Sequence, residues 1–126
     1  MLPDAQYANG APLLEVRDLR THVFTRRGVV KAVNGVSFQV RAGETLGLVG
    51  ESGSGKTMTC LSILRLLPRG ARIVSGEIVL QGTNLAAASE ATMERVRGKQ
   101  IGMVLQNALA TLDPVFTIGT QVANRW

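Results

Sequence analysis

The sequence predicts an α/β fold built around a phosphate-binding loop, and three adjacent features support this prediction. Residues 50–57 read Gly-Glu-Ser-Gly-Ser-Gly-Lys-Thr and fit the pattern G-x-x-x-x-G-K-[ST]. The apolar run 45–50 before the loop is typical of a buried, parallel strand. After the loop, apolar residues recur at helical spacing until Pro68. A phosphate site of this kind requires a strand, a glycine-rich loop and a helix in this order.

The residue types in the loop suit phosphate binding. Glycines let the backbone turn tightly, so several N–H groups can converge on phosphate oxygens without an intervening Cβ. Lys56 places a compact positive charge at the β- and γ-phosphates, and the hydroxyl of Thr57 can ligate Mg²⁺. The alternative is a glycine-rich turn that ends in Lys-Thr by chance, and the surrounding strand and helix pattern argues against it.

Antiparallel β structure is predicted before the loop. Residues 1–12 are polar and interrupted by proline and glycine, so they form a loose leader, and the folded domain comprises 13–126. Strand-like stretches lie within 13–24, a hairpin turn follows at 26–28, and 29–40 form a second strand region.

Three more elements are predicted after the loop and its helix. Residues 75–82 form a strand with turns on both sides, and 89–97 form a short helix that ends at Gly98. Residues 101–105 form a strand that delivers Gln106 at its end.

The composition fits a globular protein and gives no support to a nucleic-acid interface. Of the 126 residues, 45% are hydrophobic and 18% are charged. The formal net charge of +5 comes from cations that are scattered along the sequence, without a basic run interleaved with aromatic residues. We attribute this charge to a solvated surface with some attraction to phosphates or to an anionic membrane face.

The chain is expected to be cytosolic, with membrane association supplied by a partner. No apolar segment has the length that a bilayer crossing needs, and the N-terminus lacks a signal-peptide pattern. The single cysteine, Cys60, is expected to be a helix residue without a disulfide or metal role.

Several segments around and beyond the loop share the pattern of one protein family. They are 32–38, 43–57, 62–68, 75–78, 97–99, 103–106 and 112–114. Together they make the sequence resemble the N-terminal part of an ABC transporter ATP-binding subunit of the oligopeptide/dipeptide (nickel) importer subfamily. The resemblance extends from Leu13 to about Val122.

The resemblance implies a P-loop NTPase fold of the ABC ATPase type, present in incomplete form. An N-terminal antiparallel β region would precede the Walker A strand, loop and helix, and the chain would end after the Q-loop, at the start of the helical subdomain. The sequence contains no Leu-Ser-Gly-Gly-Gln signature, no Walker B strand ending in Asp-Glu and no switch histidine. We therefore expect marginal stability, exposed strand edges and no ATP turnover by this chain alone.

The resemblance also implies ATP and Mg²⁺ as cofactors and assigns site residues. The nucleotide-binding residues would be Gly50, Glu51, Ser52, Gly53, Ser54, Gly55, Lys56, Thr57 and Met58, with Phe24 as the candidate that stacks on adenine. Gln106 would be the catalytic Q-loop glutamine, and Thr57 and Gln106 would face the metal. On the residues alone, the favoured interpretation of Gln106 is an ordinary polar residue at a strand end, and Phe24 is equally a core residue.

Some residues depart from the family pattern. Met58 stands where relatives often carry a hydroxyl, and Leu105, Asn107 and Ala108 differ from the usual neighbours of the glutamine. Val23 falls where the family places its adenine-stacking aromatic, and Phe24 follows it. His22 is expected to be an exposed strand residue because no carboxylate partner is evident.

The favoured function is the ATP-binding subunit, in N-terminal portion, of an importer for peptides or similar small solutes. Its partners would be transmembrane permease subunits, a second ATPase subunit and, indirectly, a solute-binding protein, at the cytoplasmic side of the plasma membrane and without nucleic acid. The alternative is a non-hydrolysing fragment that pairs with or regulates a full-length ATPase subunit. A soluble ABC protein of DNA repair or translation fits less well, because segments 97–99 and 112–114 are typical of the peptide subfamily.

Overall fold

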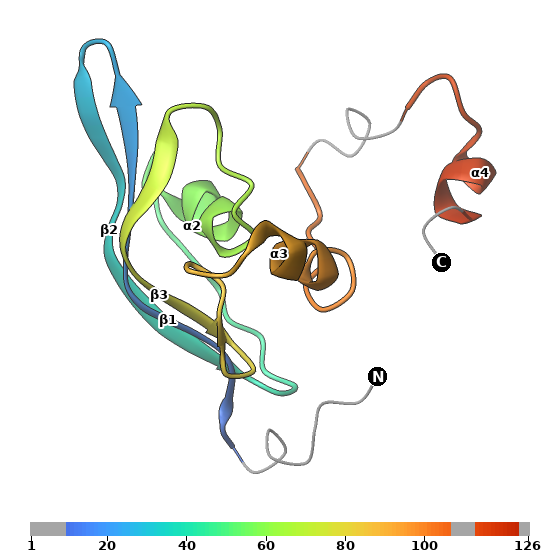
Figure 1. The fold of residues 1–126 in the computed structure, drawn as a ribbon, viewed down its shortest axis with the longest axis horizontal. Helices are drawn as coiled ribbons and strands as arrows, with labels where there is room; N and C mark the ends of the chain where they lie inside the picture. Colours follow the sequence, from blue (N-terminus) through green and yellow to red (C-terminus); the bar gives the residue numbers. More distant parts are fainter. Residues whose placement is uncertain (1–9, 107–112, 124–126) are drawn as a thin grey trace.

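The protein is built on one antiparallel sheet with helices against its concave side. The computed structural model describes residues 10–106 and 113–123. Its elements are β1 (Pro12–Thr25), β2 (Gly28–Arg41), α2 (Lys56–Ile63), β3 (Ala71–Leu80), β4 (Thr83–Asn84), α3 (Glu90–Val96) and α4 (Ile118–Ala123). The sheet order is β2-β1-β3-β4. Figure 1 shows α2 and α3 beside the curved sheet, with α4 lying away from it.

The two strands predicted before the loop are confirmed as one long hairpin. β1 and β2 pair in antiparallel register from Pro12 opposite Arg41 to Thr25 opposite Gly28. The register shifts between Val16 and Leu19, and Asp18 has a φ of 43° there. Such a bulge inserts an extra residue into one strand and lets side chains on both sides of it face the same way.

The core lies between the concave face of the sheet and the two helices. Its buried residues come from three strands, from α2 and α3, and from the turn after β4: Val16, Leu19, Val33, Ile63, Ile78, Leu80, Leu85, Met93 and Val96. Burial of these apolar side chains is the main force that holds α2 and α3 on the sheet.

A buried pair of hydroxyl groups joins α2 to β1 inside this core. The side chains of Thr21 and Ser62 are fully buried, and their oxygens are 2.8 Å apart. The Ser62 hydroxyl donates to the carbonyl of Met58 at 2.7 Å, so the hydrogen between the two side chains comes from Thr21. This bond fixes the helix against the strand at one point, because each buried hydroxyl needs its partner.

The strands predicted at 45–50 and 101–105 are wrong for the described structure. Residues 44–50 have no ladder partner, and the Val49 side chain is 95% exposed. Beyond a single bridge between Arg97 and Ile101, residues 102–105 are also unpaired, and Val104 is 94% exposed. Their composition suits buried parallel strands, but a strand of that kind forms only between neighbouring strands, and the described residues supply none.

The helix after the loop ends at Ile63, five residues before Pro68, which the sequence predicted as its end. The N–H of Leu66 donates to the carbonyl of Leu61 at 2.9 Å, and the N–H of Arg65 donates to Ser62 at 3.0 Å. With Arg65 at a φ of 52°, these two bonds form a Schellman motif that closes the helix. Arg65 takes the position that glycine usually occupies.

The other predicted elements are present. The strand predicted at 75–82 is part of β3, and the helix predicted at 89–97 is α3, whose Ser89 side chain accepts a bond from the N–H of Thr92 at 3.2 Å. Pro12, predicted in the leader, already lies in β1. Within residues 10–106 and 113–123, no helix has the length and apolar content of a membrane span.

Replacing Ser62 by alanine tests the buried hydroxyl pair. Ser62→Ala leaves the buried Thr21 hydroxyl without a partner and should lower the unfolding free energy by about 1–3 kcal/mol. Thr21→Val should lower the unfolding free energy by less, because the Ser62 hydroxyl keeps its bond to the carbonyl of Met58. Urea denaturation measures both effects, and the double variant should be more stable than the sum of the single effects implies. Strictly additive effects would show that the two side chains are not coupled.

Candidate functional site

The phosphate-binding loop lies between the sheet and the first turn of α2. The chain leaves β2 at Arg41, runs extended through 44–50, and turns where the N–H of Ser54 donates to the carbonyl of Glu51 at 3.2 Å. Gly53 and Gly55 have φ values of 82° and 93°, which L-residues rarely adopt. The order of loop and helix predicted from the sequence is therefore confirmed, although the preceding segment is not a strand.

Gly55 is constrained by a close approach to the backbone of β2 as well as by its positive φ angle. A Cβ at this position would lie 2.3 Å from the carbonyl oxygen of Ala32 in β2. A side chain has no room there, because the opposing atom belongs to a strand backbone that the hairpin holds in place. At Gly53 no heavy atom lies within 4 Å of such a Cβ. The contact of Gly55 with β2 sets where α2 begins.

Lys56 lies folded over the loop that precedes it. Its ammonium donates to the carbonyls of Gly50 and Glu51 at 2.6 and 2.7 Å, and to the hydroxyl of Ser54 at 3.3 Å. A Cβ on Gly50 would lie 2.6 Å from the Ser54 oxygen and 3.9 Å from the Lys56 nitrogen, so a side chain there would fill the hollow of the loop. The loop is thus a small cradle with one positive charge inside it.

The first turn of α2 offers hydrogen-bond donors next to this charge. Within residues 10–106, the N–H groups of Lys56, Thr57 and Met58 have no protein acceptor, and no side chain caps the helix. The Thr57 side chain is exposed, whereas Met58 packs against the core. Met58 can therefore contribute its N–H but not its side chain. The Thr59 hydroxyl is used internally, donating to the carbonyl of Gly55 at 2.9 Å.

These residues fit a phosphate group, and one of them fits a metal bound together with it. Free N–H groups at a helix N-terminus and an adjacent ammonium are the donors that phosphate oxygens need. Among the described residues, no group of three or more His, Cys, Asp or Glu side chains could hold a metal ion. The Thr57 hydroxyl provides a protein oxygen at the loop. One such oxygen suits Mg²⁺, because this ion takes few protein ligands when phosphates supply the others.

The two site residues predicted outside the loop lie at other places. Gln106 is exposed in a bend after residues 102–105, and no described contact joins it to Lys56 or Thr57. Its neighbours Asn107 and Ala108 lie outside the described residues. The roles assigned to Gln106 therefore stay predictions.

Phe24 lies near the end of β1 and is 37% exposed, so it is not a core residue. The guanidinium carbon of Arg72 is 4.1 Å from its ring centroid, and the His22 ring is 6.4 Å away. Arg72 thus covers one face of Phe24 in a cation–π contact. The predicted stacking of adenine on this ring is untested by the described contacts.

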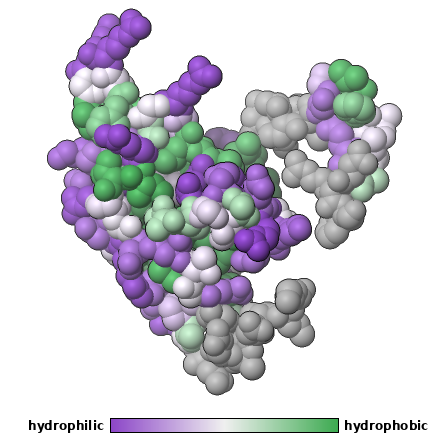
Figure 2. All heavy atoms as spheres, viewed as in Figure 1, coloured by the Kyte–Doolittle hydropathy of each residue, from purple (hydrophilic) through white to green (hydrophobic). Residues whose placement is uncertain are grey.

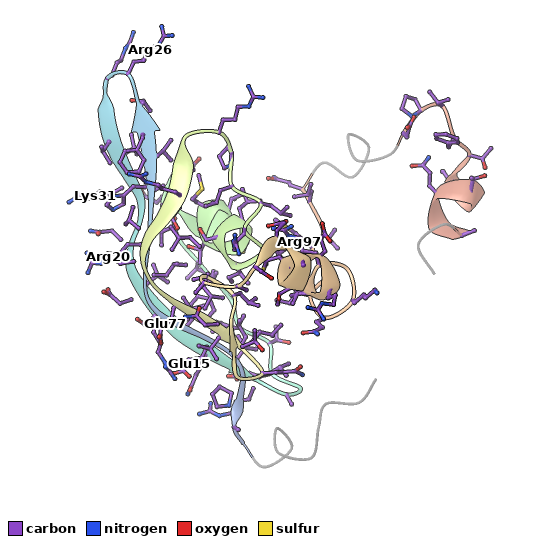
Figure 3. The ribbon with its side chains drawn as sticks, viewed as in Figure 1. Glu15, Arg20, Arg26, Lys31, Glu77 and Arg97 are labelled. Carbon is purple, nitrogen blue, oxygen red and sulfur yellow. The ribbon has the colours of Figure 1, made fainter. Side chains whose placement is uncertain are left out.

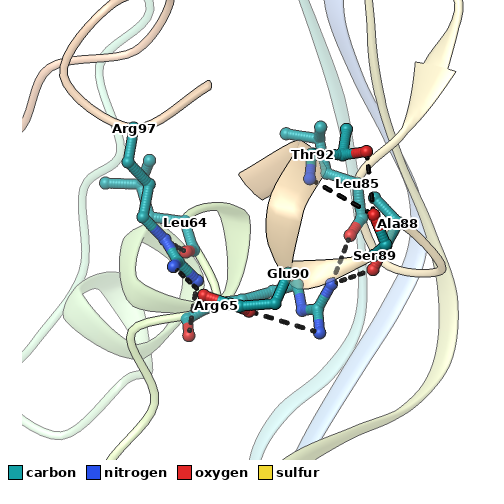
Figure 4. Close-up of polar contacts among 8 residues, drawn as sticks. All are labelled: Leu64, Arg65, Leu85, Ala88, Ser89, Glu90, Thr92 and Arg97. Atoms are coloured by element: carbon teal, nitrogen blue, oxygen red, sulfur yellow. Dashed lines mark hydrogen bonds and ion pairs between the residues drawn. The ribbon is translucent and has the colours of Figure 1, made fainter. Parts of the chain in front are cut away.

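Side chains distant in sequence also hold the far end of α2, as Figure 4 shows. The Arg97 guanidinium donates to the carbonyls of Leu64 and Arg65 at 2.8 and 3.4 Å and pairs with Glu90. Arg65 donates to the carbonyl of Ala88 and lies 4.0 Å from the same Glu90 carboxylate. These bonds hold the two residues that follow α2, and they join the end of α2 to α3.

These positioning roles do not follow from the sequence patterns. Ala32 and Arg97 stand in the family segments 32–38 and 97–99, and no motif marks Thr21. A polar Ser62 within an apolar helix pattern was the one local signal of a buried partner. The partners of Gly55 and Arg97 are set by tertiary contacts, for which the sequence carries no local signal.

The family is decided by comparison with known proteins. The family model described as ABC transporter matches residues 33–126, which include the loop, α2, β3 and α3. The chain belongs to the ABC transporter family. This confirms the family and the fold type that the sequence resemblance implied, with the antiparallel β1–β2 hairpin preceding the loop and its helix.

Individual ABC relatives are similar over most of the chain. A Sinorhizobium fredii protein named a probable peptide ABC transporter ATP-binding protein is 51% identical over 112 residues, covering 88% of this chain and 33% of that protein. An oligopeptide transport ATP-binding protein of Bacillus subtilis is 44% identical over 111 residues, covering 87% of this chain and 31% of that protein. The chain thus spans about a third of the length of these curated relatives.

Two glycine substitutions separate backbone strain from steric overlap in the loop. Gly53→Ala should lower the unfolding free energy by about 1–2 kcal/mol, because only the positive φ is strained. Gly55→Ala should cost about 2–5 kcal/mol, because its Cβ also overlaps the Ala32 carbonyl. Chemical denaturation followed by circular dichroism measures both. Equal losses for the two variants would contradict the close contact with β2.

Arginine substitutions test the anchor at the other end of α2. Arg97→Ala should lower the unfolding free energy by about 1–3 kcal/mol, because the carbonyls of Leu64 and Arg65 and the Glu90 carboxylate lose their donor. Arg97→Lys should recover only part of this loss, since an ammonium lacks the planar fork of the guanidinium. Arg95→Ala on the exposed side of α3 is the control and should change stability by about 0.5 kcal/mol or less. An Arg97→Ala variant as stable as this control would contradict the anchor.

Proposed function

We propose that loop 50–57 binds the phosphates of ATP, with Mg²⁺, as part of the ATP-binding subunit of an ABC importer. The observation that carries this proposal is the arrangement around Lys56. Its ammonium lies inside the cradle formed by Gly50, Glu51 and Ser54, directly before a helix whose first N–H groups are free. Donors and charge converge there on one small volume, as an anionic ligand requires.

Each part of the loop has a distinct task in this proposal. Lys56 exchanges its carbonyl partners for phosphate oxygens, and the N–H groups of Lys56, Thr57 and Met58 donate to the same phosphates. Thr57 supplies a hydroxyl ligand for Mg²⁺, and the bound metal neutralises part of the phosphate charge. Phe24 as adenine contact and Gln106 as the glutamine facing metal and water complete the proposed site.

The assignment to peptide import rests on the names of similar proteins. Relatives that are 44–51% identical are named as peptide or oligopeptide ATP-binding proteins of transport systems. We propose the same class of solute here, with permease subunits, a second ATPase subunit and, indirectly, a solute-binding protein as partners. The chain would then act as a peripheral protein on the cytoplasmic side of the plasma membrane, coupling ATP binding and hydrolysis to uptake.

Lysine substitutions with matched net charge test nucleotide binding. Lys56→Ala should weaken binding of Mg²⁺-ATP about 10- to 100-fold, because a charge-assisted bond to phosphate is lost. Lys99→Ala removes the same charge from an exposed position outside the loop and should bind like the unmodified chain. Isothermal titration calorimetry gives both affinities. Equal affinities of the unmodified chain and Lys56→Ala, or no binding by the unmodified chain, would refute the proposed site.

A further inference from the structure

The outer, convex face of the sheet carries its charges unevenly. At the end near the start of β1, Arg17 pairs with Glu15 at 2.6 Å and with Glu77 at 2.9 Å. The hydrogen bond from Arg17 holds the pKa of the Glu15 carboxyl below its ordinary value. Farther along β1, Arg20 pairs with Asp18 at 3.0 Å. The positive charge at this end is therefore balanced by neighbouring carboxylates.

The opposite end of the sheet collects cations that have no such partners among residues 10–106 and 113–123. In the register of the strands, His22 of β1 lies between Lys31 of β2 and Arg72 of β3. The N–H of Phe24 donates to the carbonyl of Gly70 at 2.8 Å, which places the neighbouring Arg69 at this end as well. The hairpin turn adds two more arginines. We call this set the hairpin-tip patch, and it comprises Arg26, Arg27, Lys31, Arg69 and Arg72.

No carboxylate balances the hairpin-tip patch within the part of the chain that the structure describes. None of its five cations forms an ion pair with a described residue. Residues 19–43 and 52–76, which contain the whole patch, include neither Asp nor Glu. Figure 3 shows the separation, with Arg26 and Lys31 toward the hairpin turn and Glu15 and Glu77 toward the other end. Cations that appear scattered in the sequence are thus gathered by the strand pairing.

Exposed apolar side chains accompany these cations. Val29 and Val30 follow the hairpin turn and are 53% and 56% exposed. Figure 2 shows strongly hydrophilic residues at the projecting end of the hairpin, with hydrophobic residues directly below them. The ring of Phe24 lies at the same end of the sheet and has the Arg72 guanidinium on one face. The projecting end of the molecule therefore combines positive charge with aliphatic surface.

We propose that the hairpin-tip patch binds the headgroup surface of an anionic phospholipid bilayer. Guanidinium groups form paired hydrogen bonds with phosphate oxygens, and each cation near an anionic bilayer contributes about a fivefold gain in affinity. Val29 and Val30 add aliphatic contacts that suit the interface below the headgroups. This partner is favoured over nucleic acid, because the patch lacks the row of free aromatic faces on which bases stack. The proposal is independent of nucleotide binding by the loop.

Two variants of equal net charge test the proposal. Arg26→Gln/Arg27→Gln removes two charges from the patch, and Arg95→Gln/Lys99→Gln removes two exposed charges from α3 and the turn after it. Both lower the formal net charge from +5 to +3, that is by the two cations removed. Sedimentation with vesicles of phosphatidylcholine and phosphatidylglycerol measures binding, with pure phosphatidylcholine vesicles as reference and circular dichroism to verify folding.

We expect binding to the anionic vesicles only, and a loss of about 25-fold for the tip variant at low salt. The α3 variant should bind like the unmodified chain. Lys56→Ala should also bind vesicles normally, which separates this proposal from the nucleotide site. Three results would overturn it: no binding to anionic vesicles, equal losses in the two charge-matched variants, or tighter binding to a labelled DNA duplex or an acidic peptide than to vesicles.

Discussion

The approach of Gly55 to the carbonyl of Ala32 is the contact on which the arrangement of the site depends. It brings the end of the loop against the backbone of β2, and the helix must start at that point. The Thr21–Ser62 bond then fixes the last turn of the same helix against β1, and Arg97 binds the carbonyls of Leu64 and Arg65 directly after it. Three attachments from three separate parts of the chain thus orient one short helix. The position of the loop is thus set by α2, the helix directly after it, which is held against the sheet.

Local patterns in the sequence predict the parts of this fold that depend on local physics. The loop motif, the hairpin and α3 follow from residue spacing, from turn residues and from the glycine that ends the helix, and all are present. Residues 45–50 and 101–105 have strand-like composition, but pairing decides whether a strand forms, and pairing involves distant residues. The residue that follows the end of α2 is likewise bound by a distant partner, because Arg97 lies 33 residues beyond Leu64. The local sequence does not show which distant segment will lie beside a given strand or helix.

In the candidate site, too, some features follow from the local sequence and others depend on contacts between distant parts of the chain. The residues of loop 50–57 lie in one contiguous segment, so their proximity follows from the sequence, and the structure adds that Met58 turns its side chain into the core. Phe24 and Gln106 were assigned by family resemblance, and their relation to the loop depends on the path of the whole chain. The hairpin-tip patch does not appear as a cluster in the sequence. The grouping of its cations arises from the pairing of β1 with two strands far apart in sequence.

The position of Lys56 has a consequence for how a ligand enters. Its ammonium is already stripped of part of its hydration and held by three oxygens of the loop. In the proposed phosphate site, an arriving phosphate would replace these neutral acceptors with charged ones and would not have to order a mobile side chain. The entropy of ordering this lysine is lost when the protein folds, before any ligand is present. Under this proposal, recognition at the loop would be an exchange of hydrogen-bond partners around a lysine that the folded chain already holds in place.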